Sequence, residues 1–249
     1  MQAKLPSFLK FKSANDLIRM GRDNEGGYLV CQSDVMKSEV LISLGICDDW
    51  SFETDFTKRN NVAVHAYDAS VNFRFWLKRT LAETLKNPLG FYAFRKFFSY
   101  KSFFKGQNKH IKKFVGLDTR DEIYCTLSSI LDDFDSENIF LKIDIESSEY
   151  RLLDTLVAYQ NKISGLAMEL HDCDLHLDKI KDFVEKLDLN LVHVHANNYA
   201  PIRREDGLPV VLEITFSKHG DLADEAYLPH DLDMPNDVAA PEVNLSFEA

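Results

Sequence analysis

Residues 40–53 read VLISLGICDDWSFE, in which the apolar run Val40–Ile46 ends at two aspartates, Asp48 and Asp49. Short runs of this kind, rich in β-branched residues and without strict alternation, are typical of strands buried on both faces. A glycine after such a strand lets the backbone approach a ligand closely, and a helix N-terminus that follows favours anionic groups. Gly45 and the residues after it therefore form a candidate ligand-binding loop.

Similar apolar runs recur along the chain, at Val62–Tyr67, Asn138–Ile145, Ile163–Leu170, Leu189–His195 and Val210–Phe216. Between them, Ser148–Gln160 and Asp174–Leu187 carry apolar residues at the spacing of one helical stripe. Strands that alternate with helices predict a mostly parallel sheet covered on both faces. The sequence therefore predicts an α/β, doubly wound fold in a single domain, residues 1–249.

The composition fits a folded domain and excludes several classes of protein. The chain has 249 residues, 45% of them hydrophobic, and 29 Lys and Arg against 40 Asp and Glu give a net charge of −11. An acidic chain is a poor general nucleic-acid binder, because phosphate neutralisation needs a basic face. No stretch reaches the ~18 apolar residues of a membrane span, and Met1–Lys12 lacks the apolar core of a signal peptide. The four cysteines form no C-x-x-C pair, so we expect a cytoplasmic protein without a disulfide framework.

Residues 72–113 break this pattern. They contain eleven Lys or Arg, one acid and eleven aromatic residues, and the remainder of the chain carries 18 basic and 39 acidic residues, or −21. Such asymmetry often marks a surface that faces an anion or a membrane. We expect an inserted helical lid between the second and third strands; the alternative is a solvated basic helix whose aromatic side chains pack on the core. Residues 219–249 have eight acids and no Lys or Arg, which predicts an acidic wrap over the surface.

Asp68 follows the second apolar run, twenty-three residues after Gly45. An acid at this place accepts hydrogen bonds from a ribose diol in dinucleotide-binding folds, although Asp68 alone could equally cap a helix. The fingerprint G-x-G-x-x-G is absent, which argues against a nicotinamide dehydrogenase. Upstream, the Asn24–Gly27 cluster is a turn by its chemistry and favours a hairpin that leads into a strand at Tyr28–Cys31. Together, Gly45 and Asp68 indicate a cofactor that contains a nucleoside.

The late strands end in a dense set of polar residues: Asp144, Glu146, Glu149, Glu169, His171, Asp172, His193, His195, Asn197 and Asn198. Alternation along a strand places His193 and His195 on one face, and likewise Glu169 and His171. Carboxylates and imidazoles that meet at one edge of a sheet can bind a divalent metal or supply a general base. A single histidine of this kind is more often a hydrogen-bonded structural residue, but several that converge predict at least one base or ligand.

Six motifs occur in a fixed order: G-R-D-N-E-G-G-Y-L-V (21–30), S-L-G-I-C-D-D-W-S-F-E (43–53), A-Y-D (66–68), L-K-I-D-I-E-S-S-E-Y (141–150), E-L-H-D (169–172) and H-V-H-A-N-N-Y-A-P (193–201). This set resembles the FkbM-type class I methyltransferases, which use S-adenosylmethionine and often occur with glycan or secondary-metabolite biosynthesis. The resemblance runs from about Arg19 to Asn236 and omits the basic aromatic insert. It implies a seven-stranded, Rossmann-like sheet whose last strand, Val210–Phe216, is antiparallel.

By this resemblance, the loop after Gly45 cradles the methionine part of the cofactor, Asp68 holds its ribose, and Asp144 faces the transferred methyl group. The Arg22–Tyr28 turn closes over the site. The resemblance thus implies one set of cofactor-binding residues: Arg22, Asp23, Gly26, Gly27, Tyr28, Gly45, Cys47, Ser51, Phe52, Glu53 and Asp68. Two positions depart from the family pattern, since Cys47 and Ser147 stand where glycines are common.

We expect methyl transfer from S-adenosyl-L-methionine to a sugar hydroxyl of a small-molecule or glycan acceptor. The basic insert suggests an anionic acceptor, or a lipid-linked one at the inner membrane surface. A hydroxyl needs its proton removed or its pKa lowered by a metal. The expected catalytic residues are Asp144, His171 and His195 with Glu169 as orienting partner, and the same four would hold a divalent metal such as Mg or Mn. A metal-dependent hydrolase, a non-catalytic pseudo-methyltransferase, and N-methylation of an amino sugar or phosphoramidate stay open.

Overall fold

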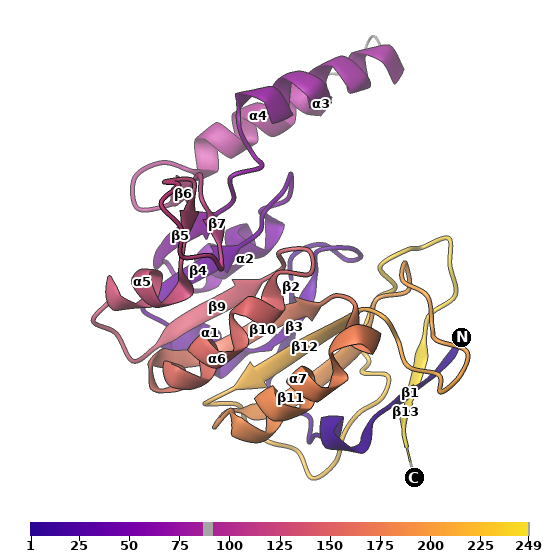
Figure 1. The fold of residues 1–249 in the computed structure, drawn as a ribbon. Helices are drawn as coiled ribbons and strands as arrows, with labels where there is room; N and C mark the ends of the chain where they lie inside the picture. The colour runs from indigo at the N-terminus through magenta and orange to yellow at the C-terminus, as the bar shows by residue number, and fades with distance from the viewer. Residues whose placement is uncertain (87–91, 249) are drawn as a thin grey trace.

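A seven-stranded sheet forms the centre of the computed structural model, which describes residues 1–86 and 92–248 (Figure 1). The strands lie in the order β11-β12-β10-β9-β4-β5-β6. Along the chain they are β4 (Val40–Leu44), β5 (Ala63–Tyr67), β6 (Lys109–Ile111), β9 (Ile139–Ile143), β10 (Ile163–Leu170), β11 (Asn190–Ala196) and β12 (Leu212–Ser217). β12 runs antiparallel to β10 and β11, and the other neighbouring pairs are parallel. The predicted doubly wound, Rossmann-like fold with an antiparallel last strand is confirmed.

The strand order reverses between β4 and β9. From β4 the chain builds outward through β5 to β6, then returns to β9 and builds in the other direction through β10. All residues of β4 and β9 are buried, as expected for central strands covered on both faces. The carboxyl ends of β4, β5 and β9 therefore meet at a switch point, where open α/β sheets bind their ligands.

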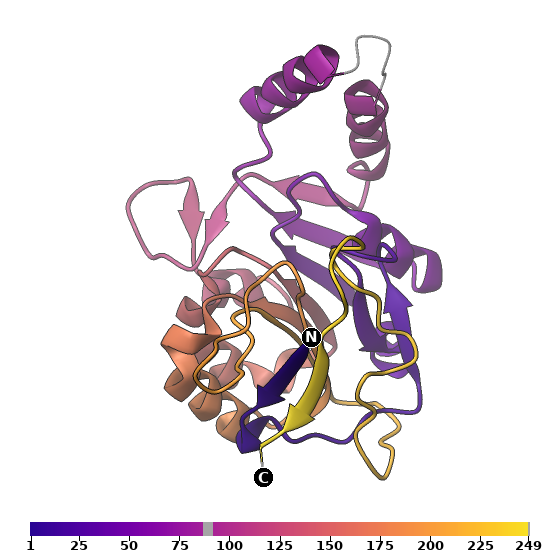
Figure 2. The same ribbon diagram turned by 90° about the vertical axis from the view of Figure 1, so that its right-hand side faces the viewer.

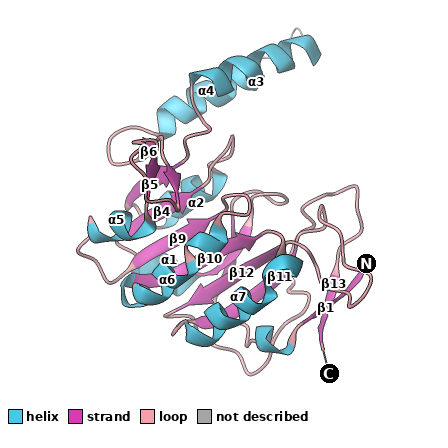
Figure 3. Cartoon of the chain, in the orientation of Figure 1, coloured by secondary structure: helices cyan, strands magenta, loops and turns pink. Residues whose placement is uncertain are grey.

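Helices cover both faces of the sheet (Figure 3). On one face pack α5 (Leu127–Asp132), α6 (Leu153–Ala158) and α7 (Cys173–Lys186). On the other pack α1 (Gln32–Lys37), α2 (Ser51–Arg59) and the hairpin of β2 (Leu17–Met20) and β3 (Tyr28–Cys31). The predicted hairpin into Tyr28–Cys31 is confirmed.

The predicted helix over Ser148–Gln160 is wrong in its length. The short α6 is flanked by the 3₁₀ turns η2 (Glu149–Arg151) and η3 (Gln160–Lys162). The Glu149 side chain turns back and accepts a hydrogen bond from the Ile145 N–H at 3.0 Å, which tightens this turn. The second predicted helix, Asp174–Leu187, agrees with α7 to within one residue at each end.

Between β5 and β6 the chain forms α3 (Phe73–Lys86) and α4 (Tyr92–Phe103), a pair of helices that projects away from the sheet (Figure 2). The end of the range predicted as an insert differs in the structure. Residues 109–111 form β6, which joins the edge of the sheet by pairing with β5. These three residues are Lys109, His110 and Ile111, so the sequence carries only one apolar side chain where the central strands carry a continuous apolar run.

The tail beyond β12 lies against side chains of β11 and β12 until β13 (Asn244–Phe247), which pairs in parallel with β1 (Gln2–Leu5) (Figure 2). The 3₁₀ turn η1 (Ser7–Leu9) follows β1. The tail contacts the β2–β3 turn, where the Asn24 side chain donates to the Pro235 carbonyl at 2.8 Å. A further small pair joins β7 (Phe114–Val115) to β8 (Tyr124–Cys125). Within residues 1–86 and 92–248, no helix combines the length and apolar character needed to cross a bilayer.

Candidate functional site

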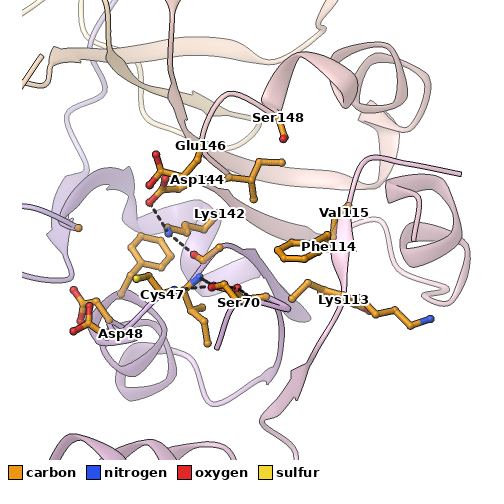
Figure 4. A pocket seen from close by; sticks show the side chains of 18 of the residues that line it. Cys47, Asp48, Ser70, Lys113, Phe114, Val115, Lys142, Asp144, Glu146 and Ser148 are labelled. Atoms are coloured by element: carbon orange, nitrogen blue, oxygen red, sulfur yellow. Dashed lines mark hydrogen bonds and ion pairs between the residues drawn. The ribbon is translucent and has the colours of Figure 1, made fainter. Parts of the chain in front are cut away.

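A cavity of about 760 Å³ lies at the switch point, at the carboxyl ends of β4, β5 and β9. This volume falls within the range of small-molecule and cofactor sites, about 300–1,000 Å³. Figure 4 shows Phe114 and Val115 on one side of the cavity, Cys47 and Asp48 on the other, and Asp144 above them in this view. The loop after β4 and the β7–β8 pair therefore form opposite walls.

Gly45 shapes the loop after β4. Its φ is +81°, and a side chain there would place its Cβ 1.7 Å from the Asp144 carbonyl oxygen. The Gly45 N–H donates to the Tyr67 carbonyl at 3.0 Å, and the Asp144 N–H donates to the Leu44 carbonyl at 2.9 Å. The three strand ends approach one another so closely that only glycine fits between them. The main chain of the loop thus lines the cavity without a side chain in the way.

Asp68 follows β5 and fixes the same loop. Its Oδ2 accepts the N–H groups of Ile46 at 3.1 Å and Cys47 at 2.9 Å, and Oδ1 accepts the N–H of Ser70 at 2.7 Å and its hydroxyl at 2.6 Å. A carboxylate offers about four lone-pair sites, and these four contacts use them. A ribose diol bound to Asp68 would therefore have to displace or share the contacts of Ser70.

Asp48 and Asp49 tie the loop to two other parts of the chain. In the β2–β3 turn, Arg22 Nε lies 2.9 Å from the Asp49 carboxylate. From the projecting helices, Arg79 forms an ion pair with the Asp48 carboxylate, and Lys96 donates a hydrogen bond to the Asp48 carbonyl. The turn and the helical insert thus both hold the loop that lines the cavity.

Three side-chain-bearing residues in the loops that border the cavity have a positive φ: Cys47 at +42°, Glu146 at +53° and Ser147 at +67°. This region favours glycine and costs other residues about 1–2 kcal/mol. Cys47 and Ser147 are the two positions at which the sequence departs from the glycines of the FkbM pattern. At both positions the backbone has a conformation that glycine adopts more readily than cysteine or serine does.

We expect Cys47→Gly and Ser147→Gly each to raise the free energy of unfolding by about 0.5–1 kcal/mol, because the relieved strain exceeds the extra entropy of an unfolded glycine. Ser148→Gly is the matched control, since Ser148 has a φ of −93° and gains nothing from glycine. Urea denaturation of the three variants measures the effect. A loss of stability in all three would contradict the strain at Cys47 and Ser147.

Lys142 is a buried cation in β9, with 7% of its side chain exposed. Its Nζ donates to the Gly45 carbonyl at 2.8 Å and pairs with the Asp144 carboxylate at 3.3 Å. Burial lowers the pKa of Lys142, but the Asp144 and Glu53 carboxylates outweigh burial and hold this pKa above its ordinary value. The Tyr28 hydroxyl also donates to Asp144, at 3.4 Å. Asp144 is therefore held from two sides beside the cavity.

Asp144, Glu169 and His171 each place one ligand atom within 4.8 Å of the others. Burial raises the pKa of Glu169 to about 8, and neighbouring carboxylates such as Asp144 add to this shift. Burial lowers the pKa of His171, but its hydrogen bond to Glu149, at 3.2 Å, and the nearby carboxylates raise it to about 9. The structure thus brings together three of the four predicted metal ligands.

His195 lies apart from this group. Its Nδ1 is 3.0 Å from Glu213 and its Nε2 is 3.1 Å from Glu242 of the tail. The reason is the strand order: β12 lies between β10 and β11, so Glu213 separates His195 from Glu169 in the register. His193, on the same face, pairs with Asp233 of the tail at 2.9 Å. Both histidines anchor the tail to the sheet.

The protonation of His195 gives the fold a pH dependence. Burial lowers the pKa of His195, but Glu213 and Glu242 outweigh burial and raise it to about 10. Since this pKa lies above its ordinary value of 6.5, the stabilisation is complete below pH 6.5 and is lost as the pH rises to about 10. We expect the melting temperature to fall by several degrees over this window.

Thermal unfolding of His195→Gln tests the assignment, because this variant cannot titrate and its profile should be flatter between neutral pH and about pH 10. His65→Gln is the control: burial lowers the pKa of His65, so the steep profile should remain. Equal slopes in wild type and His195→Gln would contradict the role of His195.

No protein-family model matches the sequence, and no curated protein matches it. Several solved structures are similar to the chain. The precorrin-6y C5,15-methyltransferase of Geobacter metallireducens is 14% identical with a TM-score of 0.39, and the match covers 76% of this chain and 86% of that one. An rRNA methylase of Streptococcus thermophilus is 10% identical with a TM-score of 0.36, covering 75% and 92%. TrmK of M. capricolum, bound to S-adenosyl-homocysteine, is 12% identical with a TM-score of 0.37, covering 82% and 74%. At these identities the FkbM-type family stays a prediction. The reaction is therefore inferred below from the residues of this chain alone.

The cavity contains many of the residues predicted to bind a cofactor or face the methyl group: Arg22, Gly26, Gly45, Cys47, Phe52, Glu53, Asp68 and Asp144. Four others lie outside its lining. Tyr28 contacts Asp144, Ser51 donates to the Asp49 carboxylate, and Gly27 allows the tight turn, since a Cβ there would lie 2.0 Å from the Arg22 carbonyl oxygen. Asp23 is exposed.

Sequence reasoning missed Lys142 and the wall formed by Phe114, Val115 and Leu117. The signal for Lys142 was a single cation inside an otherwise apolar strand, which needs a buried counter-charge. The wall comes from β7, which has two residues and so gives no measurable periodicity.

Proposed function

We propose that the chain is an S-adenosylmethionine-dependent methyltransferase of the FkbM type that methylates a sugar hydroxyl of a glycan or small-molecule acceptor. One observation carries the proposal: a single cavity joins a glycine-shaped loop after β4, an acid after β5 and an acid after β9. A nucleoside-bearing ligand in an open α/β sheet uses these strand ends.

The residues present fit both ends of this cofactor. At one end, Phe114 and Val115 offer an apolar wall for an adenine ring. Asp68 Oδ1 can accept from the ribose when the ribose displaces or shares the contacts of Ser70. At the other end, Arg22 offers a cation for the carboxylate of the methionine part. Glu53 also lines the cavity, and its buried Oε2 has no hydrogen-bond partner among the described residues, so it can accept from an ammonium group.

S-adenosylmethionine supplies a methyl group on a positively charged sulfur when it is bound. Seven Asp or Glu, among them Asp144 and Glu25, line the cavity against four Lys or Arg, and this excess of negative charge favours a cation over a neutral product. Lys142 and Tyr28 hold the Asp144 carboxylate in place, so it need not reorganise during the reaction. The largest contribution of the protein is then to orient the acceptor toward the methyl group.

We further propose that Asp144, Glu169 and His171 activate the acceptor hydroxyl by holding a divalent cation, which would lower the hydroxyl pKa. Binding of the cation would release the protons that the raised pKa values of Glu169 and His171 otherwise retain near neutral pH. The two carboxylate donors suit Mg or Mn, whereas an imidazole donor is more typical of transition-metal sites. The buried Glu149 carboxylate lies 3.2 Å from His171 Nδ1, where it can accept the ring proton. Histidine ligands of metals usually donate their second ring nitrogen in this way.

Calorimetric titration of the full chain with S-adenosylmethionine and S-adenosylhomocysteine tests the proposal. We expect both to bind in the micromolar range, with the sulfonium compound favoured, and no binding of either would overturn the proposal. EDTA should leave this binding intact and abolish transfer to a sugar acceptor. His171→Gln should lose affinity for Mn. His219→Gln is the matched control and should keep this affinity, because His219 is half-buried like His171 but lies outside the group of Asp144, Glu169 and His171.

The same three ligands support a second candidate function, a metal-dependent hydrolase. Bound Mn without affinity for either sulfur compound would favour the hydrolase. Binding of the cofactor without transfer to any acceptor would favour a pseudo-methyltransferase.

A further inference from the structure

The helices α3 and α4 expose large apolar side chains on their outer faces. On α3, Phe73, Leu77 and Leu81 follow one another at four-residue spacing, which places them on one stripe. Phe73 is 78% exposed. On α4, Phe94 and Phe98 have the same spacing and are 60% and 54% exposed, and their rings meet edge to face with centroids 4.5 Å apart. Five exposed apolar side chains on two adjacent helices form a patch of the kind that marks an interaction site.

The opposite faces of the two helices account for their attachment to the body of the protein. Trp76 and Tyr100 are buried and pack on Trp50, with ring centroids 6.4 Å and 5.8 Å from it. Arg79 and Lys96 bind Asp48 from the same side. The aromatic side chains thus divide: one set packs on the core, as one prediction had it, and the other set faces outward.

Basic side chains flank the apolar stripes, namely Arg74, Lys78, Arg95, Lys101 and Lys105, all of them exposed. Residues 72–113 carry eleven Lys or Arg and one acid, whereas the remainder of the chain has a net charge of −21. Because α3 and α4 project from the sheet (Figure 1), their outer faces lie away from the acidic body. The protein therefore presents a surface that is both apolar and positively charged.

We propose that the outer faces of α3 and α4 dock the protein on an anionic lipid surface. Amphipathic helices with Phe and Leu beside Lys and Arg lie in the headgroup region, where apolar side chains enter the acyl boundary and the cations meet anionic lipids. A second copy fits this surface poorly, because self-pairing would bring the two basic faces together. A free anionic glycan would pair with the cations but leave the apolar stripes exposed to water.

Sedimentation of the full chain with vesicles tests the docking. Vesicles of phosphatidylcholine mixed with phosphatidylglycerol should bind the protein, and added salt should weaken binding by screening the charges. Vesicles of phosphatidylcholine alone should bind it at least about tenfold more weakly. The measurement needs no methyl donor, so it can succeed whether or not the proposed methyl transfer is correct.

Two variants separate the apolar and ionic contributions. Phe73→Ser/Leu77→Ser/Phe98→Ser and Arg74→Glu/Lys78→Glu/Arg95→Glu should each lower binding at least about tenfold. The changed side chains are exposed, so the fold should be kept, and circular dichroism with thermal unfolding checks this without any ligand. The matched controls Leu175→Ser/Val238→Ser and Lys37→Glu/Lys179→Glu, which also change exposed residues, should bind like the wild type.

Several outcomes would overturn the docking. These are absence of vesicle binding, equal binding to neutral and anionic vesicles, and equal losses in the control variants. Light scattering gives a further contradicting outcome. If the wild type is a dimer and the Phe73→Ser/Leu77→Ser/Phe98→Ser variant is a monomer, this face is a contact between copies of the chain.

Discussion

Lys142→Met is expected to lower the free energy of unfolding by about 3–5 kcal/mol, because it leaves the buried Glu53 and the partly buried Asp144 without their cation. In the native structure the Lys142 ammonium pairs with Asp144, and Glu53 lies close enough to raise its pKa. The variant also removes the donor to the Gly45 carbonyl, so the loop loses a contact at the cavity. Guanidinium denaturation, with thermal unfolding as a second probe, measures the loss.

The matched control is Lys186→Met, which removes an exposed lysine paired with Asp182 and should cost less than about 0.5 kcal/mol. Lys142→Met/Asp144→Asn should recover part of the stability, since it removes one of the stranded charges. If Lys142→Met is too unstable to purify, comparison of the double variant with Asp144→Asn alone measures the loss of Lys142 when residue 144 is uncharged. Equal losses of stability in Lys142→Met and Lys186→Met would contradict this prediction, because Asp144 and Glu53 would then not depend on Lys142 as their counter-charge.

Asp68→Ala is expected to weaken the binding of S-adenosylhomocysteine about 100-fold. Hydrogen bonds to a charged group contribute about 1.5–3 kcal/mol each. The variant loses the proposed contact to the ribose and the hydrogen bonds that Asp68 accepts from the two loop N–H groups. The affinity of Asp68→Asn should lie between those of the wild type and Asp68→Ala, because an amide keeps one acceptor oxygen. Calorimetry of the purified variants measures the affinity.

Ser70→Ala is the informative companion variant, since it removes the hydroxyl that competes for Asp68 Oδ1. If the ribose shares this oxygen, Ser70→Ala should bind at least as tightly as the wild type. Affinity unchanged in Asp68→Ala would remove Asp68 from the binding site and leave it the role of holding the loop.

The central strands could be predicted from the sequence because they are buried on both faces. β4, β5, β9 and β10 read as short apolar runs, and their carboxyl ends placed Gly45, Asp68, Asp144 and Glu169 at one edge. The family resemblance added the antiparallel β12. These features depend on local composition and on chain order, both of which one sequence carries.

The position of β12 between β10 and β11 shows what the apolar pattern alone could not provide. The apolar pattern predicts that Val210–Phe216 is a strand, but the choice of neighbour depends on which edges are free when it pairs. For this reason His195 was grouped with Glu169, although Glu213 lies between them. β7 and β8, with two residues each, are likewise defined by tertiary pairing rather than by sequence period.

The interior position of β12 also has a consequence for the order of folding. β12 is the last of the seven strands along the chain, yet β11 has no neighbour in the sheet until β12 inserts beside it. Pairings between segments far apart in sequence form slowly, and an unpaired edge such as that of β10 is prone to wrong association in the meantime. During synthesis, the cavity formed by β4, β5 and β9 can assemble first. The buried row of Glu169, Glu213 and His195 closes only at the end.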